Sequence, residues 1–376
     1  MNNRIVLFID SLGSGGAQRQ ILMLAKQLVR ADFDVSLLVY HDIDDLAYML
    51  EPEIKLELIP KNAQALPKFL YRVFQYFRRE KPRAIIAYLY GPSLMSRTLG
   101  RLAGVSTVIT SQRNLDLDKS SIQYILERLT YRLATKIVTN AYATKDQLCD
   151  LLPKASEKLE VIHNAVDTGL FSPLSREERS KLRRDRDLAD SEFVFLLPGR
   201  IEVQKNHLGL IQAALEVADR REFVILFAGN EFDLRIKDRV KTAISGTRLA
   251  DRVIFLGQQK DMRSVYALAD CVILPSLWEG LPNVLIEAMA CECPVIASDV
   301  ADNKIVVPKD CGIVFDLDGP AELTDAMSRL LDMDSSARVE MGLACRKHVE
   351  ANFSETAFLE KHLKLIGAST PSGSRE

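Results

Sequence analysis

Two glutamates eight positions apart, Glu279 and Glu287, stand in the most informative stretch of the chain. An apolar run ending at Leu274 predicts a strand, and a loop then carries Glu279 ahead of an apolar helix that contains Glu287. A carboxylate in such a helix is unusual, because burying an unpaired charge costs several kcal/mol. Spacing alone leaves two interpretations open: carboxylates that bind a ligand, or a surface Glu279 and a Glu287 that faces solvent.

The ligand-binding interpretation follows from where open α/β sheets bind small molecules. If Glu287 points toward the carboxyl ends of the strands, it lies in the crevice that such sheets use. There it could accept two hydrogen bonds from the vicinal hydroxyls of a ribose, and Glu279 could hold the hydroxyls of a sugar. The start of the helix between them favours phosphate, because backbone dipoles converge there. That helix start comprises Gly280, Leu281, Pro282, Asn283 and Val284.

A second cluster follows the apolar run that ends at Leu197, where Gly199, Arg200 and Lys205 occupy one predicted loop. A guanidinium fork and an ammonium after a strand suit a diphosphate, because both donate charged hydrogen bonds to its oxygens. The alternative is a loop with two solvated cations. His207, just beyond, is expected to cap or pack rather than to catalyse.

The N-terminus has a Rossmann-like opening. An apolar strand over 4–9 is followed by the turn Gly15-Gly16, a helix over 17–30 and a second strand over 35–40. The dinucleotide fingerprint requires a small residue where this chain has Gln18, so an oxidoreductase is disfavoured.

The stretch from Ser276 to Asp299 reads S-x-W-E-G-L-P-N-V-x-x-E-A-M-A-x-x-x-P-V-I-A-S-D. This pattern resembles the signature of retaining glycosyltransferases of family 4, which have the two-domain GT-B fold. The resemblance spans nearly the whole chain, and its specific parts are 199–205 and 275–299. It implies an α/β fold of two Rossmann-like domains facing across a cleft, and it favours the ligand-binding interpretation of both clusters.

The resemblance also implies roles for individual residues. The second glutamate, Glu287, would bind the nucleotide ribose, and Glu279 would contact the donor sugar. Arg200 and Lys205 would act with Glu279 in catalysis by stabilising the leaving diphosphate. Many relatives carry a histidine near the strand end at 111–114, where this chain offers Arg113 and Asn114 as acceptor-side candidates. The remaining donor-side positions are Gly15, Gly16, Gly199, Gly257 and Gln258, the last two expected near the base.

The chain's 376 residues exceed what one ordinary core supports. We expect an N-terminal acceptor-side domain over 1–168 and a nucleotide-sugar-binding domain over 169–350. Residues 351–376 are expected to form a helix that crosses back to the first domain, plus a disordered tail. No apolar run approaches the roughly 20 residues of a membrane span, and we expect no signal peptide.

The charge distribution limits the kinds of partner that the protein could bind. Residues 1–170 hold 22 Lys/Arg against 18 Asp/Glu, which suits an anionic membrane surface or a phosphate-bearing acceptor. The basic, aromatic segment 64–83 predicts a helix that either rests on anionic lipid or packs with its cations extended into solvent. No nucleic-acid-binding motif is present.

The six scattered cysteines lack a zinc spacing and fit a cytosolic protein. Asp116-x-Asp118 and Asp316-x-Asp318 are interpreted as surface acids, so we expect neither a metal nor another cofactor.

The sequence therefore predicts a retaining glycosyltransferase that moves a hexose or N-acetylhexosamine from a nucleotide-sugar, with UDP-sugars favoured. The acceptor would be a hydroxyl of a glycan, lipid-linked as in surface polysaccharide synthesis at the inner face of the cytoplasmic membrane. Two alternatives remain open. One is a related enzyme that hydrolyses or epimerises a nucleotide-sugar, and the other is a non-catalytic subunit that only binds one.

Overall fold

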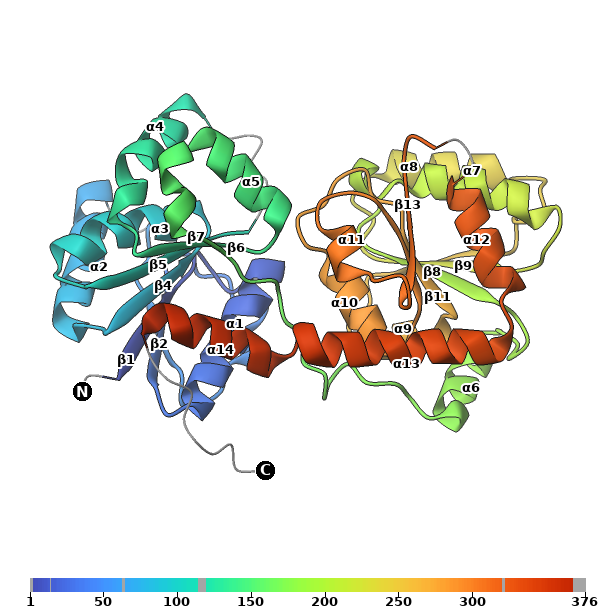
Figure 1. Cartoon of the computed structure of the whole chain (residues 1–376), viewed down its shortest axis with the longest axis horizontal. Coiled ribbons are helices and arrows are strands. Elements are labelled where there is room, and N and C mark those ends of the chain that lie inside the picture. The colour runs from blue at the N-terminus through green and yellow to red at the C-terminus, as the bar shows by residue number, and fades with distance from the viewer. Residues whose placement is uncertain (1–2, 14, 63–64, 114–119, 320–321, 368–376) are drawn as a thin grey trace. The chain divides into compact units, whose positions relative to one another are not determined.

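The computed structural model describes residues 3–13, 15–62, 65–113, 120–319 and 322–367. The chain divides into two units: unit 1 comprises residues 1–165 and 355–376, and unit 2 comprises 166–354. Each unit is a parallel sheet with helices on both faces (Figure 1). This confirms the expected fold of two α/β domains.

Unit 1 is built on a seven-stranded sheet in the order β3-β2-β1-β4-β5-β6-β7, with every neighbouring pair parallel. Its central strands are almost wholly apolar because helices cover both faces. The strands are β1 Arg4–Phe8, β2 Asp34–Val39, β3 Lys55–Leu58, β4 Ala84–Tyr88, β5 Thr107–Gln112, β6 Lys136–Thr139 and β7 Leu159–Val161.

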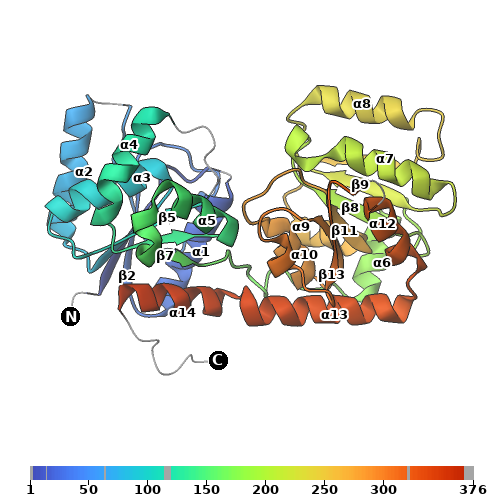
Figure 2. The same cartoon turned by 45° about the horizontal axis from the view of Figure 1, so that its top comes forward.

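Helices α1 and α14 pack together on one face of this sheet and enclose a shared core (Figure 2). The opposite face is covered by α2, by the helix that runs from α3 into a π turn, η2, and by α5. The helices are α1 Gly16–Arg30, α2 Leu66–Glu80, α3 Tyr90–Met95, α4 Ser121–Thr130, α5 Tyr142–Leu151 and α14 Glu355–Ile366; the short turns are η1 Ala47–Met49, η2 Ser96–Gly100, η3 Tyr131–Leu133 and η4 Pro153–Lys158.

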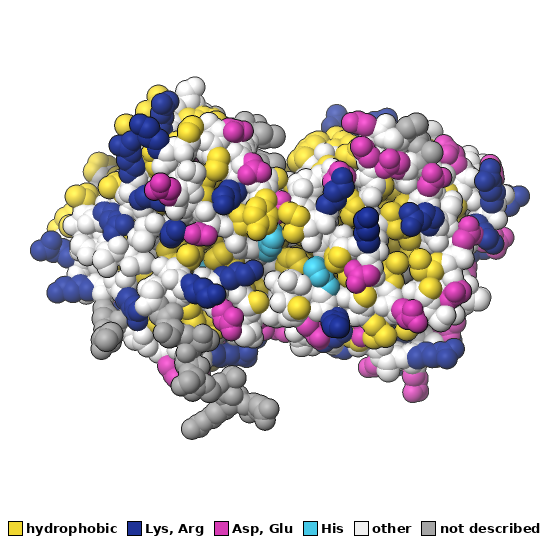
Figure 3. Space-filling model, in the orientation of Figure 1, with side chains coloured by type: hydrophobic (Ala, Val, Ile, Leu, Met, Phe, Trp, Pro, Cys, Tyr) yellow, Lys and Arg dark blue, Asp and Glu magenta, His cyan; other side chains and the backbone are white. Residues whose placement is uncertain are grey.

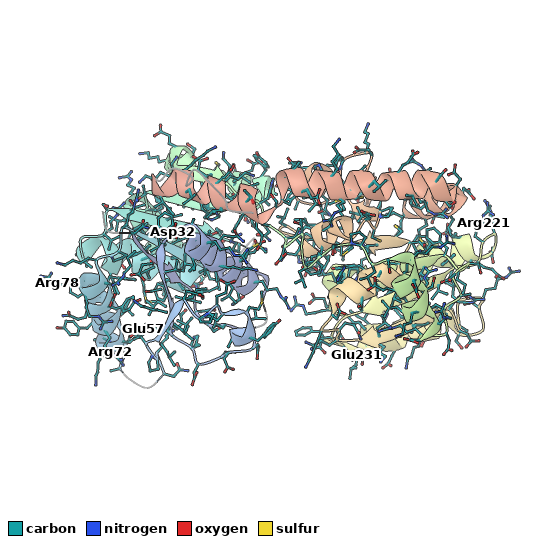
Figure 4. All side chains as sticks on the ribbon, turned by 90° about the horizontal axis from the view of Figure 1, so that it is seen from below. Asp32, Glu57, Arg72, Arg78, Arg221 and Glu231 are labelled. Carbon is teal, nitrogen blue, oxygen red and sulfur yellow. The ribbon has the colours of Figure 1, made fainter. Side chains whose placement is uncertain are left out.

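The basic, aromatic segment folds as α2, and most of its large residues turn inward. Phe69, Val73, Tyr76 and Phe77 are buried in the core against β1 and β4. Tyr71 is exposed, and Arg72 and Arg78 reach outward (Figure 4). Most large residues of α2 therefore pack against the sheet, as one of the two interpretations of this segment expected. A contact of α2 with lipid stays a prediction.

Unit 2 has a six-stranded parallel sheet in the order β10-β9-β8-β11-β12-β13. Helices α7, α8 and α12 enclose the core on one face, while α9, α10 and α13 enclose the core on the other. The strands are β8 Val194–Pro198, β9 Val224–Ala228, β10 Val253–Gly257, β11 Cys271–Leu274, β12 Val295–Ser298 and β13 Gly312–Phe315. The helices are α6 Arg176–Arg184, α7 His207–Ala218, α8 Leu234–Ile244, α9 Met262–Leu268, α10 Asn283–Ala290, α11 Asn303–Val306, α12 Glu322–Asp332 and α13 Ser335–Asn352, with the 3-10 turn η5 at Val203–Lys205.

The charged segment after residue 174 is anchored by a buried arginine. In α6, Arg183 donates to Asp270 Oδ2 at 2.7 Å and to the carbonyl of Leu268 at 2.8 Å. The same carboxylate oxygen accepts from Val194 N at 2.8 Å. Because Asp270 immediately precedes β11, these bonds fix the start of the strand that leads into the Glu279 loop. Among the described residues, no helix is both long enough and apolar enough to span a membrane.

Candidate active site

The loops that follow β8, β9 and β10 touch one another through their backbones at the carboxyl edge of the unit 2 sheet. Gly199 N donates to Ala228 O, and Gly229 N donates to Gly257 O, both at 2.9 Å. A Cβ on Gly229 would lie 1.9 Å from the carbonyl oxygen of Gly199, so only glycine permits this approach. Two positions expected at the donor, Gly199 and Gly257, therefore share one edge of the sheet.

Lys205 and Glu279 form a close ion pair between the β8 and β11 loops. Lys205 Nζ lies 2.5 Å from Glu279 Oε1, and the glutamate side chain is only 8% exposed. The alternative of a surface Glu279 is therefore wrong for this structure. The ion pair holds both side chains in place, because separating the charges would leave the buried carboxylate unpaired.

Gln204 joins the same two loops and was not singled out from the sequence. Its backbone carbonyl accepts from Leu277 N at 2.8 Å, and its side-chain Nε2 donates to Trp278 O at 2.7 Å. The same Nε2 lies 3.4 Å from Glu279 Oε2. A glutamine one position before the predicted phosphate-binding lysine carries no chemical signature, so only the folded loops reveal its role.

Glu287 is half-buried in α10 and has a definite partner. Tyr266, on α9, donates its hydroxyl to Glu287 Oε2 at 2.8 Å. Burial, and then the neighbouring carboxylate, raises the pKa of Tyr266 well above its usual value, so the hydroxyl stays a donor. This bond holds one oxygen of Glu287. Tyr266 was also missed from sequence, because 21 positions separate it from Glu287.

The predicted phosphate-binding helix start is present. α10 begins at Asn283, Leu281 and Pro282 ahead of it are buried, and Gly280 and Val284 are half-buried. The other donor-side side chains are more open: Arg200 is 57% exposed, pairs with Glu202 at 3.0 Å and lies over the Phe232 ring, and Gln258 is exposed. His207 packs edge-on against Phe227, and burial lowers its pKa to about 4.

Unit 1 carries a separate pocket of about 270 Å³, and it lies where β1, β2, β4 and β5 end. Gly15 and Gly16 lie nearby at the start of α1, and Gln18 donates to Asp10 Oδ1 at 3.2 Å. Gln18, which replaces the small residue of the dinucleotide fingerprint, thus orients the Asp10 carboxylate of the pocket. Burial, and then Asp10, raises the pKa of Tyr40 to about 12. The pocket is lined by Asp10, Tyr40, Leu89, Tyr90, Gly91, Pro92, Gln112 and Arg113.

Arg113 is the buried cation of this pocket. Its side chain stacks on Tyr88, with Cζ 4.0 Å from the ring centroid, and Nη1 donates to Asn164 Oδ1 at 2.7 Å. The residue is 5% exposed, and burial lowers its pKa. Within the described part of the chain, its partners are Tyr88 and Asn164, and neither is a carboxylate. Asn114, the other acceptor-side candidate, lies outside the described residues.

Of the two Asp-x-Asp segments, one lies within the described residues. Asp316 and Asp318 are exposed, and Asp318 N donates to Asp316 Oδ1 at 3.0 Å, as in an ordinary turn. Asp116 and Asp118 lie outside the described residues. The described ranges contain no group of three His, Cys, Asp or Glu side chains placed to hold a metal ion.

Comparisons with known proteins agree with this geometry. Residues 14–170 match the model of "Glycosyltransferase Family 4", and residues 192–333 match that of "Glycosyl transferases group 1". The chain belongs to the group 1, family 4 glycosyltransferases. The two matches together cover most of this glycosyltransferase and include Lys205, Glu279 and Glu287.

Similar proteins support the assignment over nearly the full length. An Escherichia coli UDP-Gal:alpha-D-GlcNAc-diphosphoundecaprenol alpha-1,3-galactosyltransferase is 24% identical over 92% of both chains. A Campylobacter jejuni N-acetylgalactosamine-N,N'-diacetylbacillosaminyl-diphospho-undecaprenol 4-alpha-N-acetylgalactosaminyltransferase is 24% identical over 88% of this chain and 91% of its own. Two solved structures share the GT-B fold at 19% identity. They are a Rickettsia africae glycosyltransferase (TM-score 0.84, 97% and 98% covered) and Anabaena HepE in complex with UDP and glucose (TM-score 0.83, 97% and 99% covered).

Proposed function

We propose that this enzyme transfers a hexose or N-acetylhexosamine from a nucleotide-sugar, with UDP-sugars favoured, to a hydroxyl of a lipid-linked glycan with retention of anomeric configuration. The observation that carries the proposal is the ion pair of Lys205 with the buried Glu279, between two loops at the carboxyl edge of the unit 2 sheet. The names of the two relatives support it, since both specify a diphosphoundecaprenol-linked acceptor and an α linkage, and one specifies UDP-Gal.

The donor would lie along the carboxyl edge of the unit 2 sheet. Glu287, held at one oxygen by Tyr266, would accept hydrogen bonds from the ribose hydroxyls. The backbone at the start of α10 would receive the phosphates. Gly257 and Gln258 would lie near the base. Glu279 would contact the hydroxyls of the donor sugar.

The chemistry assigned to the protein is electrostatic. As the bond from the sugar to the diphosphate breaks, negative charge grows on the leaving oxygen, and fixed positive groups lower the energy of that state. Lys205, held by Glu279, is such a group, and Arg200 in the same loop is a second. Retention would follow from attack by the acceptor hydroxyl on the same face, beside the leaving phosphate, which takes up the proton. We propose that no metal ion or other cofactor is required, and an assay with and without EDTA tests this.

The acceptor is assigned to the unit 1 pocket. Asp10 and Tyr40 offer hydrogen-bonding groups to a sugar, and Arg113 offers a buried positive charge. An acceptor that presents both hydroxyls and a phosphate would suit this combination. The enzyme would then work at the inner face of the cytoplasmic membrane, where lipid-linked saccharides are extended.

Thermal stability against UDP-, GDP-, ADP- and dTDP-sugars tests the donor half of the proposal, because a ligand of the native state raises the unfolding midpoint. A shift with UDP-sugars is expected. The donor that shifts the midpoint is then supplied with a polyprenyl-diphosphate-linked sugar, and the product is analysed by mass and anomeric configuration. Free sugar or an isomerised donor without acceptor would reveal hydrolysis or epimerisation. Binding without turnover would reveal a non-catalytic subunit.

A further inference from the structure

Helix α4 presents its apolar residues to solvent. Ile122 is 69% exposed, Ile125 57% and Leu129 70%, and these positions share one face at helical spacing. Leu126, beside them, and Leu133, in the following turn η3, are also exposed. We call these five residues the α4 stripe: Ile122, Ile125, Leu126, Leu129 and Leu133.

The inward side of the same helix is polar. Its buried residues are Glu127 and Thr130. Glu127 Oε1 lies 3.7 Å from Nη1 of Arg97, a guanidinium only 2% exposed in the π turn η2. A surface helix of a globular protein normally buries its apolar stripe and exposes its charges. In α4 this arrangement is inverted, and the buried ion pair holds the helix with its stripe outward.

An apolar groove continues the stripe between α4 and α5. Its volume is about 230 Å³, and Ile125 belongs to both the groove and the stripe. Leu151 in the groove is exposed as well. The groove is lined by Tyr124, Ile125, Glu127, Arg128, Leu148, Leu151 and Leu152. The exposed apolar area therefore extends across two helices, and contiguous patches of this kind mark interaction sites.

Charge indicates the kind of partner. Over residues 120–133, the exposed ionic side chains are Arg128 and Arg132, while the single acid, Glu127, is buried in its ion pair. Figure 3 shows hydrophobic and basic side chains interleaved over α4 at the upper left. An exposed aliphatic stripe flanked by arginines matches the interface of an anionic bilayer, where apolar side chains enter the acyl boundary and cations meet phosphate.

Helix α2 covers the same side of the sheet and differs from α4. Its exposed face carries cations, including Arg72 and Arg78 in Figure 4, while three of its five aromatic side chains are buried. When cations meet an anionic bilayer without apolar side chains that insert into it, the attraction is electrostatic only and falls steeply as the salt concentration rises. α2 could therefore add attraction at low salt, but it offers less apolar surface for insertion than α4.

We infer that the α4 stripe docks this enzyme on an anionic lipid bilayer. The inference rests on the proposed function in one respect: a lipid-linked acceptor lies in the membrane, so the enzyme would have to reach it there. The interaction itself needs neither donor nor acceptor. It can therefore be measured with vesicles alone.

The test is co-sedimentation of the full chain with phosphatidylcholine vesicles that contain either no anionic lipid or about one third phosphatidylglycerol. The wild type is expected to bind the anionic vesicles. Ile125→Ser/Leu129→Ser should weaken the partition coefficient about tenfold or more, because two aliphatic side chains no longer enter the interface. Arg128→Gln/Arg132→Gln should lower the preference for anionic over neutral vesicles about tenfold.

A matched control comes from unit 2. Val339→Ser/Leu343→Ser removes two exposed aliphatic side chains one helical turn apart on α13, and it should leave vesicle binding unchanged. Because all four apolar side chains are exposed, each pair of serines should keep the unfolding midpoint near that of the wild type.

Several results would overturn the inference. The wild type could fail to bind anionic vesicles at low salt, or Ile125→Ser/Leu129→Ser could bind as the wild type does. A wild-type dimer that the same substitutions dissociate, without vesicle binding, would make the stripe an interface between copies. If vesicles bind but no nucleotide-sugar raises the unfolding midpoint, the proposed function fails while the docking surface stands. The opposite pattern would remove the docking surface alone.

Discussion

The loops of unit 2 and the pocket of unit 1 solve the problem of a buried charge in different ways. In unit 2, Lys205 lies against Glu279, so the cluster balances its own charge. In unit 1, Arg113 stacks on Tyr88 and donates to the amide of Asn164, and neither partner is a carboxylate. Burying a cation without a counter-charge is costly. Because no carboxylate among the described residues pairs with Arg113, we propose that unit 2 is arranged before a ligand arrives, whereas the unit 1 pocket binds a ligand that supplies negative charge.

Lys205→Met should cause the largest loss of activity. It removes the ammonium, paired with the buried Glu279, that would stabilise the leaving diphosphate, so we expect transfer to slow about 100- to 1,000-fold. The measurement is steady-state transfer with saturating donor and acceptor. Lys136→Met is the matched control, because it breaks another lysine–glutamate pair, with Glu160 at 2.7 Å, away from both sites. Equal activity of the two variants would contradict the role given to Lys205.

Arg113→Met should reduce transfer about tenfold or more while the donor-induced shift of the unfolding midpoint stays as in the wild type. The variant replaces a buried cation whose partners among the described residues, Tyr88 and Asn164, are not carboxylates, so the free enzyme should unfold at the same temperature or higher. Kinetics at varied acceptor concentration would show the loss as a raised KM for the acceptor. A lost donor shift would contradict the separation of the two regions.

Gly91→Ala checks the same pocket without changing a charge. A Cβ at Gly91 would lie 2.7 Å from the Tyr40 hydroxyl, so the added methyl group must displace that side chain, which lines the pocket. A raised KM for the acceptor with unchanged donor binding would support the assignment. Wild-type kinetics in both Gly91→Ala and Arg113→Met would exclude this pocket as the acceptor site.

Tyr266→Phe should have a smaller effect, confined to the donor. It removes the hydroxyl that holds Glu287, and losing one such bond typically costs about 1 kcal/mol, or about fivefold in affinity. We expect the dissociation constant of the nucleotide to rise by that factor, as measured by calorimetry. Glu287→Gln should weaken binding further, because it removes the charge as well as an acceptor. Unchanged affinity in both variants would refute the ribose-binding role.

Acid sensitivity should be a property that the two regions share. Burial lowers the pKa of His207 in unit 2 to about 4 and that of His362 in unit 1 to about 3, against 6.5 in the unfolded chain. The unfolded state therefore binds more protons as the pH falls below 6.5. Each histidine's contribution to the free energy of unfolding is complete above that pH and is lost as the pH falls toward the folded pKa. At pH 6 the loss is about 1 kcal/mol per histidine. Urea unfolding of His207→Asn and His362→Asn at pH 7.5 and 6 measures this, and a decline as steep as in the wild type would contradict it.

Most residues of the candidate donor-side cluster could be located from the sequence, because they lie in two short, continuous segments. The apolar runs that became β8 and β11, and the helix that became α10, could be recognised from local pattern, and Lys205, Glu279 and Glu287 stand in or beside them. Gln204 and Tyr266 were missed for the opposite reason. Their partners lie 74 and 21 positions away, respectively, and a glutamine and a tyrosine carry no distinctive spacing.

The sequence by itself determined the two-domain α/β fold and the family, and it supplied the candidate donor-side residues, since these depend on periodicity and on a long ordered motif. Tertiary structure alone decided which polar groups are buried and what they contact. Helical spacing places Ile122, Ile125 and Leu129 on one face of α4 and aromatic residues along α2. Spacing does not say which face turns inward. Packing against the rest of unit 1 determines this. Phe69 and Phe77 of α2 pack in its core, and Glu127 of α4 pairs with Arg97.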